Sequence, residues 1–224
     1  MIRGGEELLS AAPLIPARPT LERLRAAAKS CRACPLWKTG TQTIFGEGSR
    51  DAKVMFVGEQ PGNDEDLAGR PFVGPAGKFL DKVLEEVGLD RDEVYVTNVV
   101  KHFKWKPLGK RRIHKKPNSR EIAACRPWLQ AELDVVEPTV LVCLGATAAQ
   151  ALLGKDFRVS QRRGELIESP LAPFVMATVH PSSILRAPDD EKRREAREQF
   201  TADMHKVAEV IHRETKPGRS IALR

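Results

Sequence analysis

The chain has 224 residues, 41% of them hydrophobic, and a formal net charge of +7 at pH 7. This length suits one α/β domain that buries roughly 70 to 75% of its unfolded surface. No apolar run approaches the ~20 residues of a membrane span, and Glu6, Glu7 and several prolines in the first twenty residues exclude a signal-peptide core. We therefore expect a soluble, cytoplasmic protein. The positive charge favours a polyanionic partner, unless it belongs only to solvated helix faces.

Helices and strands are predicted to alternate along the chain. We expect an extended, Ala- and Pro-rich arm over residues 1–19, followed by Thr20, a typical N-cap, and a short helix to Lys29. Apolar residues at helical spacing, a capping box at Asn118 and a terminating glycine predict the later helices. The first two of these helices cover residues 79–87 and 118–136. A third ends near Gly154, and the last has an apolar stripe from Phe200 to Ile211.

Four short apolar runs, at 54–57, 94–97, 139–144 and 174–179, are predicted to be buried strands. Strands that alternate with helices favour right-handed crossovers and a parallel sheet with helices on both faces. We find no internal repeat and no second domain, so residues 1–224 are predicted to form a single domain.

Three of these strands run directly into polar residues. Glu59 and Gln60 follow the first strand, Asn98 follows the second, and His180 follows the last. In an open parallel sheet the ligand crevice lies outside the carboxyl ends of the strands, so these four side chains are expected to face one pocket. The pattern indicates an active site.

The four cysteines form a second candidate site. Cys31 and Cys34 are spaced as C-x2-C, and Cys125 and Cys143 are separated by residues 126–142. Structural disulfides are rare in the cytoplasm, so the thiols suggest a metal or cluster site. Zinc ribbons usually have two close pairs, so the spacing weakens the case for zinc without excluding it. Four thiolates also suit a [4Fe-4S] cluster. Alternatively, Cys125 and Cys143 are core residues and the close pair is redox-active.

The glycines do not match a nucleotide-binding loop. Gly74 to Phe79 has neither the spacing nor the hydroxyl of a Walker loop, and Asp51 stands where a dinucleotide fingerprint needs its third glycine. The pattern therefore argues against a Rossmann oxidoreductase.

Several motifs, in the same order along the chain, resemble the iron-sulfur branch of the uracil-DNA glycosylases, often called family four. They are GEQPGNDEDLAGRPFVGPAGKFL, VYVTNVVK, the four cysteines and HPSSILR, and the resemblance covers roughly residues 31–210. Within that branch, residues 109–117 resemble the KRRIH insertion of the UdgX subgroup, which ordinary members lack.

The resemblance implies a three-layer α/β/α fold around a four-stranded parallel sheet, and a [4Fe-4S] cluster on Cys31, Cys34, Cys125 and Cys143. The substrate it implies is uracil-containing DNA, single- or double-stranded, and we expect a monomer to act on it. The subgroup implies that the protein stays covalently joined to the DNA through His114 after uracil excision.

The same resemblance implies roles for the pocket residues. His180 and the backbone after Glu59 would face the uracil carbonyl that gains charge, Asn98 would read the opposite amide edge, and Phe72 would stack on the flipped base. Gln60 and Ser182 complete the expected substrate-binding set. Leu185 and Arg186 resemble a wedge that fills the gap left by the flipped nucleotide.

The loop around His114 is strongly basic. Its cations are expected to attract phosphates and to disfavour imidazolium, keeping His114 neutral and nucleophilic. These cations are Lys110, Arg111, Arg112, Lys115 and Lys116. Glu59 would then either orient His114 or position water.

Two alternatives for the function remain: a turnover glycosylase whose loop only binds DNA, and a noncatalytic iron-sulfur module that senses lesions.

Overall fold

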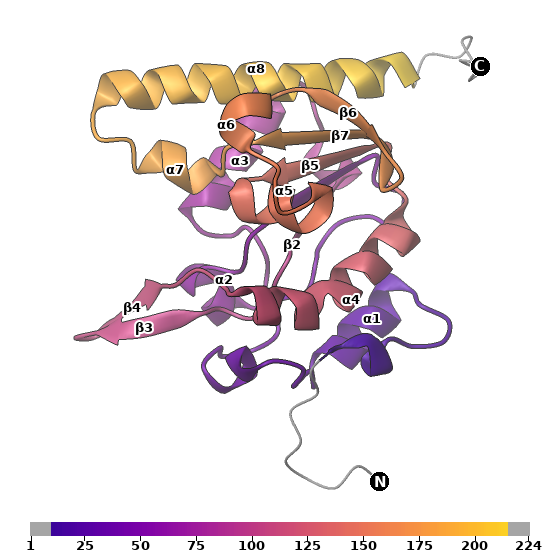
Figure 1. Ribbon diagram of the computed structural model, residues 1–224. Coiled ribbons are helices and arrows are strands. Elements are labelled where there is room, and N and C mark those ends of the chain that lie inside the picture. The colour runs from indigo at the N-terminus through magenta and orange to yellow at the C-terminus, as the bar shows by residue number, and fades with distance from the viewer. Residues whose placement is uncertain (1–9, 215–224) are drawn as a thin grey trace, which may run out of the picture.

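The computed structural model describes residues 10–214 and contains a central sheet of five strands in the order β2-β1-β5-β7-β6 (Figure 1). The first four of these pair in parallel, and β6 pairs antiparallel to β7. The strands are β1 (Val54–Gly58), β2 (Val94–Asn98), β5 (Val140–Leu144), β6 (Leu166–Ser169) and β7 (Ala172–Thr178).

The four predicted parallel strands are confirmed, and the sheet gains one edge strand that was not predicted. Residues of β1, β2 and β5 are buried at every position, as expected for strands covered on both faces. In contrast, β6 alternates exposed and intermediate residues over four positions, so it lacks the apolar run that identified the others.

Helices flank both faces of this sheet. The α-helices are α1 (Leu21–Ala28), α2 (Asn63–Ala68), α3 (Pro75–Glu86), α4 (Ser119–Val136), α5 (Ala146–Leu153), α6 (Val159–Arg162), α7 (Pro181–Leu185) and α8 (Asp190–Glu214). Short 3-10 helices occur at η1 (Ala12–Leu14), η2 (Pro35–Lys38) and η3 (Arg91–Glu93). No helix among the described residues is long and apolar enough to cross a membrane.

The predicted helix caps are confirmed. Thr20 Oγ1 accepts a hydrogen bond from the Arg23 amide at 3.2 Å, and Asn118 forms a reciprocal capping box with Glu121. Pro127 lies inside α4, which continues to Val136 as predicted. Because a helix cap involves only residues close together in the sequence, it can be predicted from the sequence alone.

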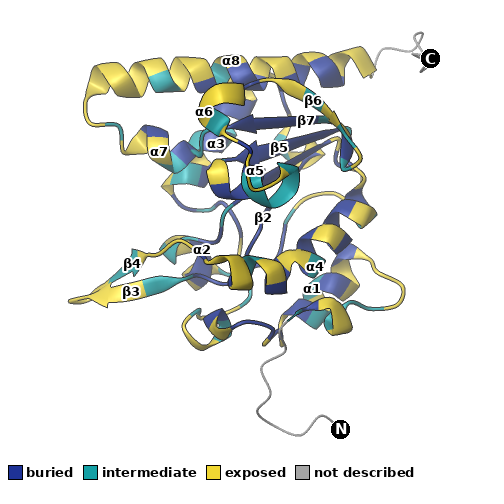
Figure 2. Cartoon of the chain, viewed as in Figure 1, coloured by how far each residue is buried: buried dark blue, intermediate teal, exposed yellow. Residues whose placement is uncertain are grey.

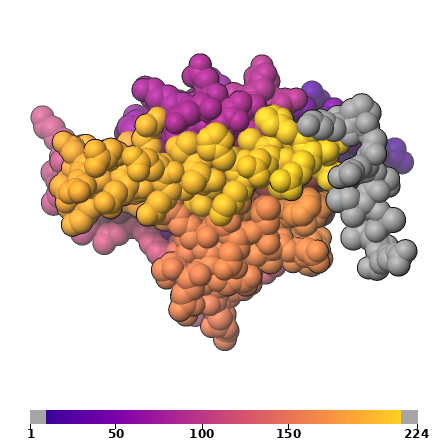
Figure 3. All heavy atoms as spheres, turned by 90° about the horizontal axis from the view of Figure 1, so that it is seen from above, coloured from indigo at the N-terminus to yellow at the C-terminus, as the bar shows by residue number. Residues whose placement is uncertain are grey.

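Alternate strand residues enter two separate cores, one on each face of the sheet. One core joins the sheet to α1, α4 and α5, and the other joins it to α3 and α8. The predicted stripe from Phe200 to Ile211 is buried against the sheet, while the opposite face of α8 is exposed (Figure 2). From above, α8 lies between the region of α3 and that of α6 and β6 (Figure 3).

The basic segment, predicted as a loop, instead belongs to a two-stranded antiparallel hairpin. Its strands are β3 (Trp105–Leu108) and β4 (Arg111–His114), and Trp105 pairs with His114. Gly109, at φ +57°, supplies the positive φ that the first position of a tight Gly-X turn requires. The hairpin projects from the body of the protein (Figure 1).

The N-terminal arm is only partly covered, because residues 1–9 lie outside the described residues. The rest of the arm is not extended as predicted. Ala11 is fully buried, and its amide donates to the Ala124 carbonyl on α4 at 2.8 Å, after which η1 follows. Packing against α4 and the 3-10 turn therefore replace the extended conformation expected for this stretch.

Candidate active site

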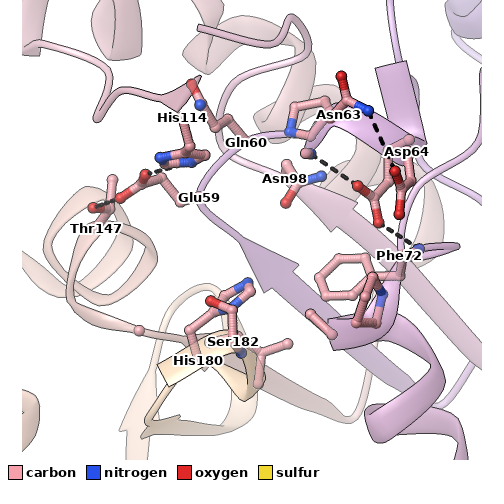
Figure 4. A pocket seen from close by; sticks show the side chains of 18 of the residues that line it. Glu59, Gln60, Asn63, Asp64, Phe72, Asn98, His114, Thr147, His180 and Ser182 are labelled. Atoms are coloured by element: carbon pink, nitrogen blue, oxygen red, sulfur yellow. Dashed lines mark hydrogen bonds and ion pairs between the residues drawn. The ribbon is translucent and has the colours of Figure 1, made fainter. Parts of the chain in front are cut away.

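A cavity of about 750 Å³ lies at the carboxyl ends of the parallel strands, within the usual size range of a ligand site. The register aligns these ends, since Gly58 pairs with Asn98 and Leu144 pairs with Thr178. All the residues predicted to bind substrate or to carry the chemistry line this cavity. They are Glu59, Gln60, Phe72, Asn98, His114, His180 and Ser182 (Figure 4).

Glu59 lies between two side chains that come from distant parts of the chain. Its Oε1 atom is 3.4 Å from Nε2 of His114, and its Oε2 atom accepts a hydrogen bond from the Thr147 hydroxyl (Figure 4). Sequence reasoning missed Thr147, although it sits in the first turn of α5, just after a predicted strand. A polar residue following the third parallel strand was the available signal.

The pKa of the His114 imidazole is lowered from its ordinary value, first by burial and also by the positive charge of Arg186. The Glu59 carboxylate acts in the opposite direction. The expectation of a neutral ring is thus supported, but the cause differs from the one inferred from the sequence. The cation that acts on the ring is Arg186, from the end of α7, rather than a cation of the basic segment.

His180 is also held neutral, since burial, followed by the charges of Arg186 and His114, lowers its pKa to about 4. Its Nδ1 atom accepts the Ser182 amide at 3.1 Å and lies 2.8 Å from the Ser182 hydroxyl. Because Nδ1 accepts, the proton is assigned to Nε2, which is then a neutral donor. Ser182 therefore orients His180.

Phe72 and Asn98 approach each other across a glycine. A Cβ on Gly58 would lie 2.4 Å from Asn98 Oδ1 and 2.9 Å from the Phe72 ring, so only glycine leaves room for both. Phe72 has φ +55°, a strained conformation for an aromatic residue, and its ring stacks with His180 at a centroid distance of 6.2 Å. Backbone strain of this kind is concentrated at functional sites.

Gln60, predicted to bind substrate, lines the cavity and also uses its amide to hold the hairpin. Its Nε2 donates to the carbonyls of Lys104 and Lys115, both at 3.1 Å, and its Oε1 accepts the Lys104 amide at 3.3 Å. Gln60 thus joins the two ends of the hairpin and fixes where β4 carries His114.

Arg112 is likewise engaged within the protein. Its guanidinium bonds Asp66 at 2.7 Å and Asn63 at 2.8 Å, and lies 5.4 Å from the ring centroids of Phe103 and Trp105. These contacts anchor β4 to α2, so the DNA-binding role expected for Arg112 does not fit its surroundings. The remaining cations of the segment, Lys110, Arg111, Lys115 and Lys116, are exposed.

The predicted wedge lies at the rim of the cavity. Leu185 and Arg186 line it from the end of α7, and Leu185 is one of the large apolar side chains that the described residues leave exposed. An exposed leucine at the rim of the cavity suits a residue that fills the gap in a base stack.

The four cysteines are all buried and none forms a disulfide. Burial raises the pKa of Cys125 to about 12, and the neighbouring Cys31 and Cys34 contribute to this rise. The pKa of Cys143, on β5, is raised to about 12 by burial alone. All four cysteines belong to the same buried core, on the face of the sheet that packs against α1 and α4. Within residues 10–214 no group of three or more His, Cys, Asp or Glu side chains is arranged to hold a metal ion.

Comparison with known proteins places this geometry in a family. The chain is 39% identical over 195 residues to the Type-4 uracil-DNA glycosylase of Thermotoga maritima, covering 87% of this chain and 96% of that protein. It is 38% identical over 188 residues to the Type-4 uracil-DNA glycosylase of Archaeoglobus fulgidus, covering 81% and 88%. Residues 45–205 match the profile of the Uracil DNA glycosylase superfamily. The chain therefore belongs to the uracil-DNA glycosylase superfamily.

Proposed function

We propose that this protein excises uracil from DNA and then remains covalently joined to the abasic sugar through His114. The observation that carries the proposal is the approach of Glu59 Oε1 to His114 Nε2, 3.4 Å apart at the wall of the cavity. A glycosylase that uses water needs no histidine there, whereas a histidine nucleophile needs a partner that orients it.

Uracil recognition requires groups that tolerate the negative charge on the departing base. His180 supplies a neutral donor, and Asn98 supplies an amide able to pair with the opposite edge of uracil. One well-placed donor contributes about 2.7 to 4 kcal/mol to such a transition state. Phe72 provides the face on which a flipped base stacks.

The covalent step balances without a further reactant. The bond between C1′ of the sugar and N1 of uracil breaks, and its electron pair leaves with the base, which takes a proton from solvent. Because Glu59 faces Nε2 of His114, it holds the ring proton there and leaves the Nδ1 lone pair for C1′. Glu59 or solvent then accepts the Nε2 proton. The neutral imidazole is a poor leaving group, so the adduct persists.

DNA binding is assigned to the exposed cations and to the rim of the cavity. Lys110, Arg111 and Lys115 carry no ion pair among the described residues and face solvent, where they neutralise flanking phosphates. Leu185 and Arg186, at the rim of the cavity, would fill the gap that the flipped nucleotide leaves in the DNA stack. We propose that a monomer is sufficient, since every group named here comes from one chain.

An iron-sulfur cluster is proposed on chemical grounds. Buried thiols outside any disulfide at Cys31, Cys34 and Cys125 are suitable cluster ligands. Cys143, expected as the fourth ligand, is on β5 and belongs to the same buried core as the other three cysteines. No step of the proposed reaction depends on the cluster.

A denaturing gel tests the proposal. Wild-type protein mixed with a uracil-containing oligonucleotide should give a one-to-one, denaturant-stable adduct, and the thymine oligonucleotide should give none because its methyl group clashes. His114→Ser leaves Glu59, Asn98 and His180 in place and admits water, so uracil release should continue with turnover and without adduct. His114→Gln fills the space and should release uracil more slowly. His205→Ser, an exposed histidine on α8, is the matched control.

The alternatives predict other outcomes. A conventional turnover glycosylase gives abasic DNA and no adduct with wild-type protein, and a noncatalytic lesion sensor gives neither. An adduct that survives in His114→Ser protein would mean that another residue is the nucleophile.

A further inference from the structure

A fully buried ion pair lies behind the end of β2 that forms the cavity wall. The side chains of Lys101 and Glu132 are 1% and 0% exposed. A buried ion pair is often no more stabilising than apolar residues of the same volume, because both charges lose their hydration. Stability alone is therefore a weak explanation for a pair in this place.

Glu132, on α4, collects donors from three separate segments. It accepts the Gly46 amide at 3.0 Å, the Tyr95 hydroxyl at 3.0 Å and the Thr97 hydroxyl at 2.9 Å, in addition to the Lys101 ammonium. Burial, followed by the charge of Glu132, raises the pKa of Tyr95 well above its usual value, so the phenol stays protonated and donates. Glu132 thereby fixes one face of β2 to α4.

Lys101 links Glu132 to the end of β2, at the edge of the sheet where the cavity lies. Its Nζ donates to Thr97 Oγ1 at 2.6 Å and to the Asn98 carbonyl at 2.8 Å. The same turn is hydrogen-bonded to the end of β1. The Val99 amide donates to the Gly58 carbonyl at 2.9 Å, and the Val100 amide donates to the Glu59 carbonyl at 3.0 Å. The turn that Lys101 closes therefore holds the backbone of Asn98 and of Glu59.

The turn also contacts the cysteine region, since the Lys101 amide donates to Cys125 Sγ at 3.3 Å. Neither Lys101 nor Glu132 lines the cavity, so neither touches a bound base. Their influence on the cavity passes through the backbone of residues 98–100.

We propose that Lys101 and Glu132 are a buried positioning pair that sets Asn98 to read uracil and sets Glu59 to face His114. The inference rests on the proposed function, because it assigns these two residues to the same reaction. A purely structural pair would support folding alone, and its neutral replacement would leave the reaction unchanged.

The double variant Lys101→Met/Glu132→Gln separates these roles. The side-chain amide that replaces the Glu132 carboxylate still accepts the Gly46 amide and the Tyr95 hydroxyl, but the charges and the bond to Asn98 are gone. We expect a thermal midpoint close to that of wild type, while the single-turnover rate of uracil release falls about 100-fold, as for a displacement near 1 Å in a reacting site. Affinity for undamaged DNA, set by the exposed cations, should not change.

Arg91→Met/Asp81→Asn is the matched control, since it removes a 3.0 Å ion pair away from the cavity by comparable substitutions. If the Lys101/Glu132 variant unfolds, Lys101→Arg retains the charge but misplaces the donor, and a rate at least about tenfold lower is expected. A folded variant of either kind that releases uracil within about threefold of the wild-type rate would overturn the inference. Wild-type protein that releases no uracil would instead overturn the proposed function.

Discussion

The hydroxyl of Thr147 donates a hydrogen bond to Glu59, and it does so to the carboxylate oxygen that does not face His114. Thr147 therefore holds the Glu59 carboxylate in one orientation, with the other oxygen directed at the imidazole. The three side chains come from α5, the β1 end and β4, so only the folded chain assembles them.

Thr147→Val should slow adduct formation about tenfold or more, because a hydrogen bond to a charged group contributes about 1.5 to 3 kcal/mol. Valine has nearly the shape of threonine but no hydroxyl, so the Glu59 carboxylate loses its fixed orientation. Single-turnover kinetics on a uracil oligonucleotide measure the effect. Thr147→Ser restores the donor and should react at close to the wild-type rate, and a slow Ser variant would show that the methyl group matters instead.

The pKa of His114 should lie below 6.5, the ordinary histidine value. The ring is then neutral at pH 7 and charges only as the pH falls through the lowered pKa, so adduct formation should be lost in that acidic range. Titration of the ring by NMR measures the midpoint directly. Glu59→Gln removes the charge that raises the pKa and should move the midpoint down, whereas Arg186→Gln should move it up. A wild-type midpoint at or above 6.5 would contradict the assigned environment.

Replacement of Arg111 and of Arg112, which are adjacent on β4, should have two different effects: the first on DNA binding and the second on the stability of the hairpin. Arg111 is exposed, so Arg111→Ala should reduce the slope of log affinity against log salt by about 0.9 without loosening the hairpin. Arg112 is bound to Asp66, so Arg112→Ala should increase amide hydrogen exchange across β3 and β4. An unchanged salt slope in Arg111→Ala protein would mean that the hairpin is not on the DNA.

Protein purified without oxygen should be brown and contain about four iron atoms per chain if the cluster is present. Cys125→Ala should lose both the colour and the iron. Cys143→Ala should lose them as well, because the Cys143 thiol is buried in the same core as the other three cysteines. Iron retained in Cys143→Ala protein would remove Cys143 from the ligand set, and a colourless wild type with one zinc would refute the cluster.

The sequence by itself determined the parallel sheet and the edge at which the cavity forms. Buried strands appear as local apolar runs, and polar residues directly follow three of these runs, so Glu59, Asn98 and His180 could be assigned to one crevice. Helix caps such as Asn118 were equally readable, since a capping box involves residues three apart.

Only the tertiary structure decided which partner each polar side chain takes. Gln60 and Arg112 lie in motifs that indicate substrate or DNA contact, yet their hydrogen-bond partners are at the ends of the hairpin and on α2. The Lys101–Glu132 pair carries no local signal of its role, and Thr147 offers only its place just after a predicted strand. Hydrogen bonds and ion pairs between segments far apart in sequence depend on how the layers pack, and that packing is not encoded in the spacing of neighbouring residues.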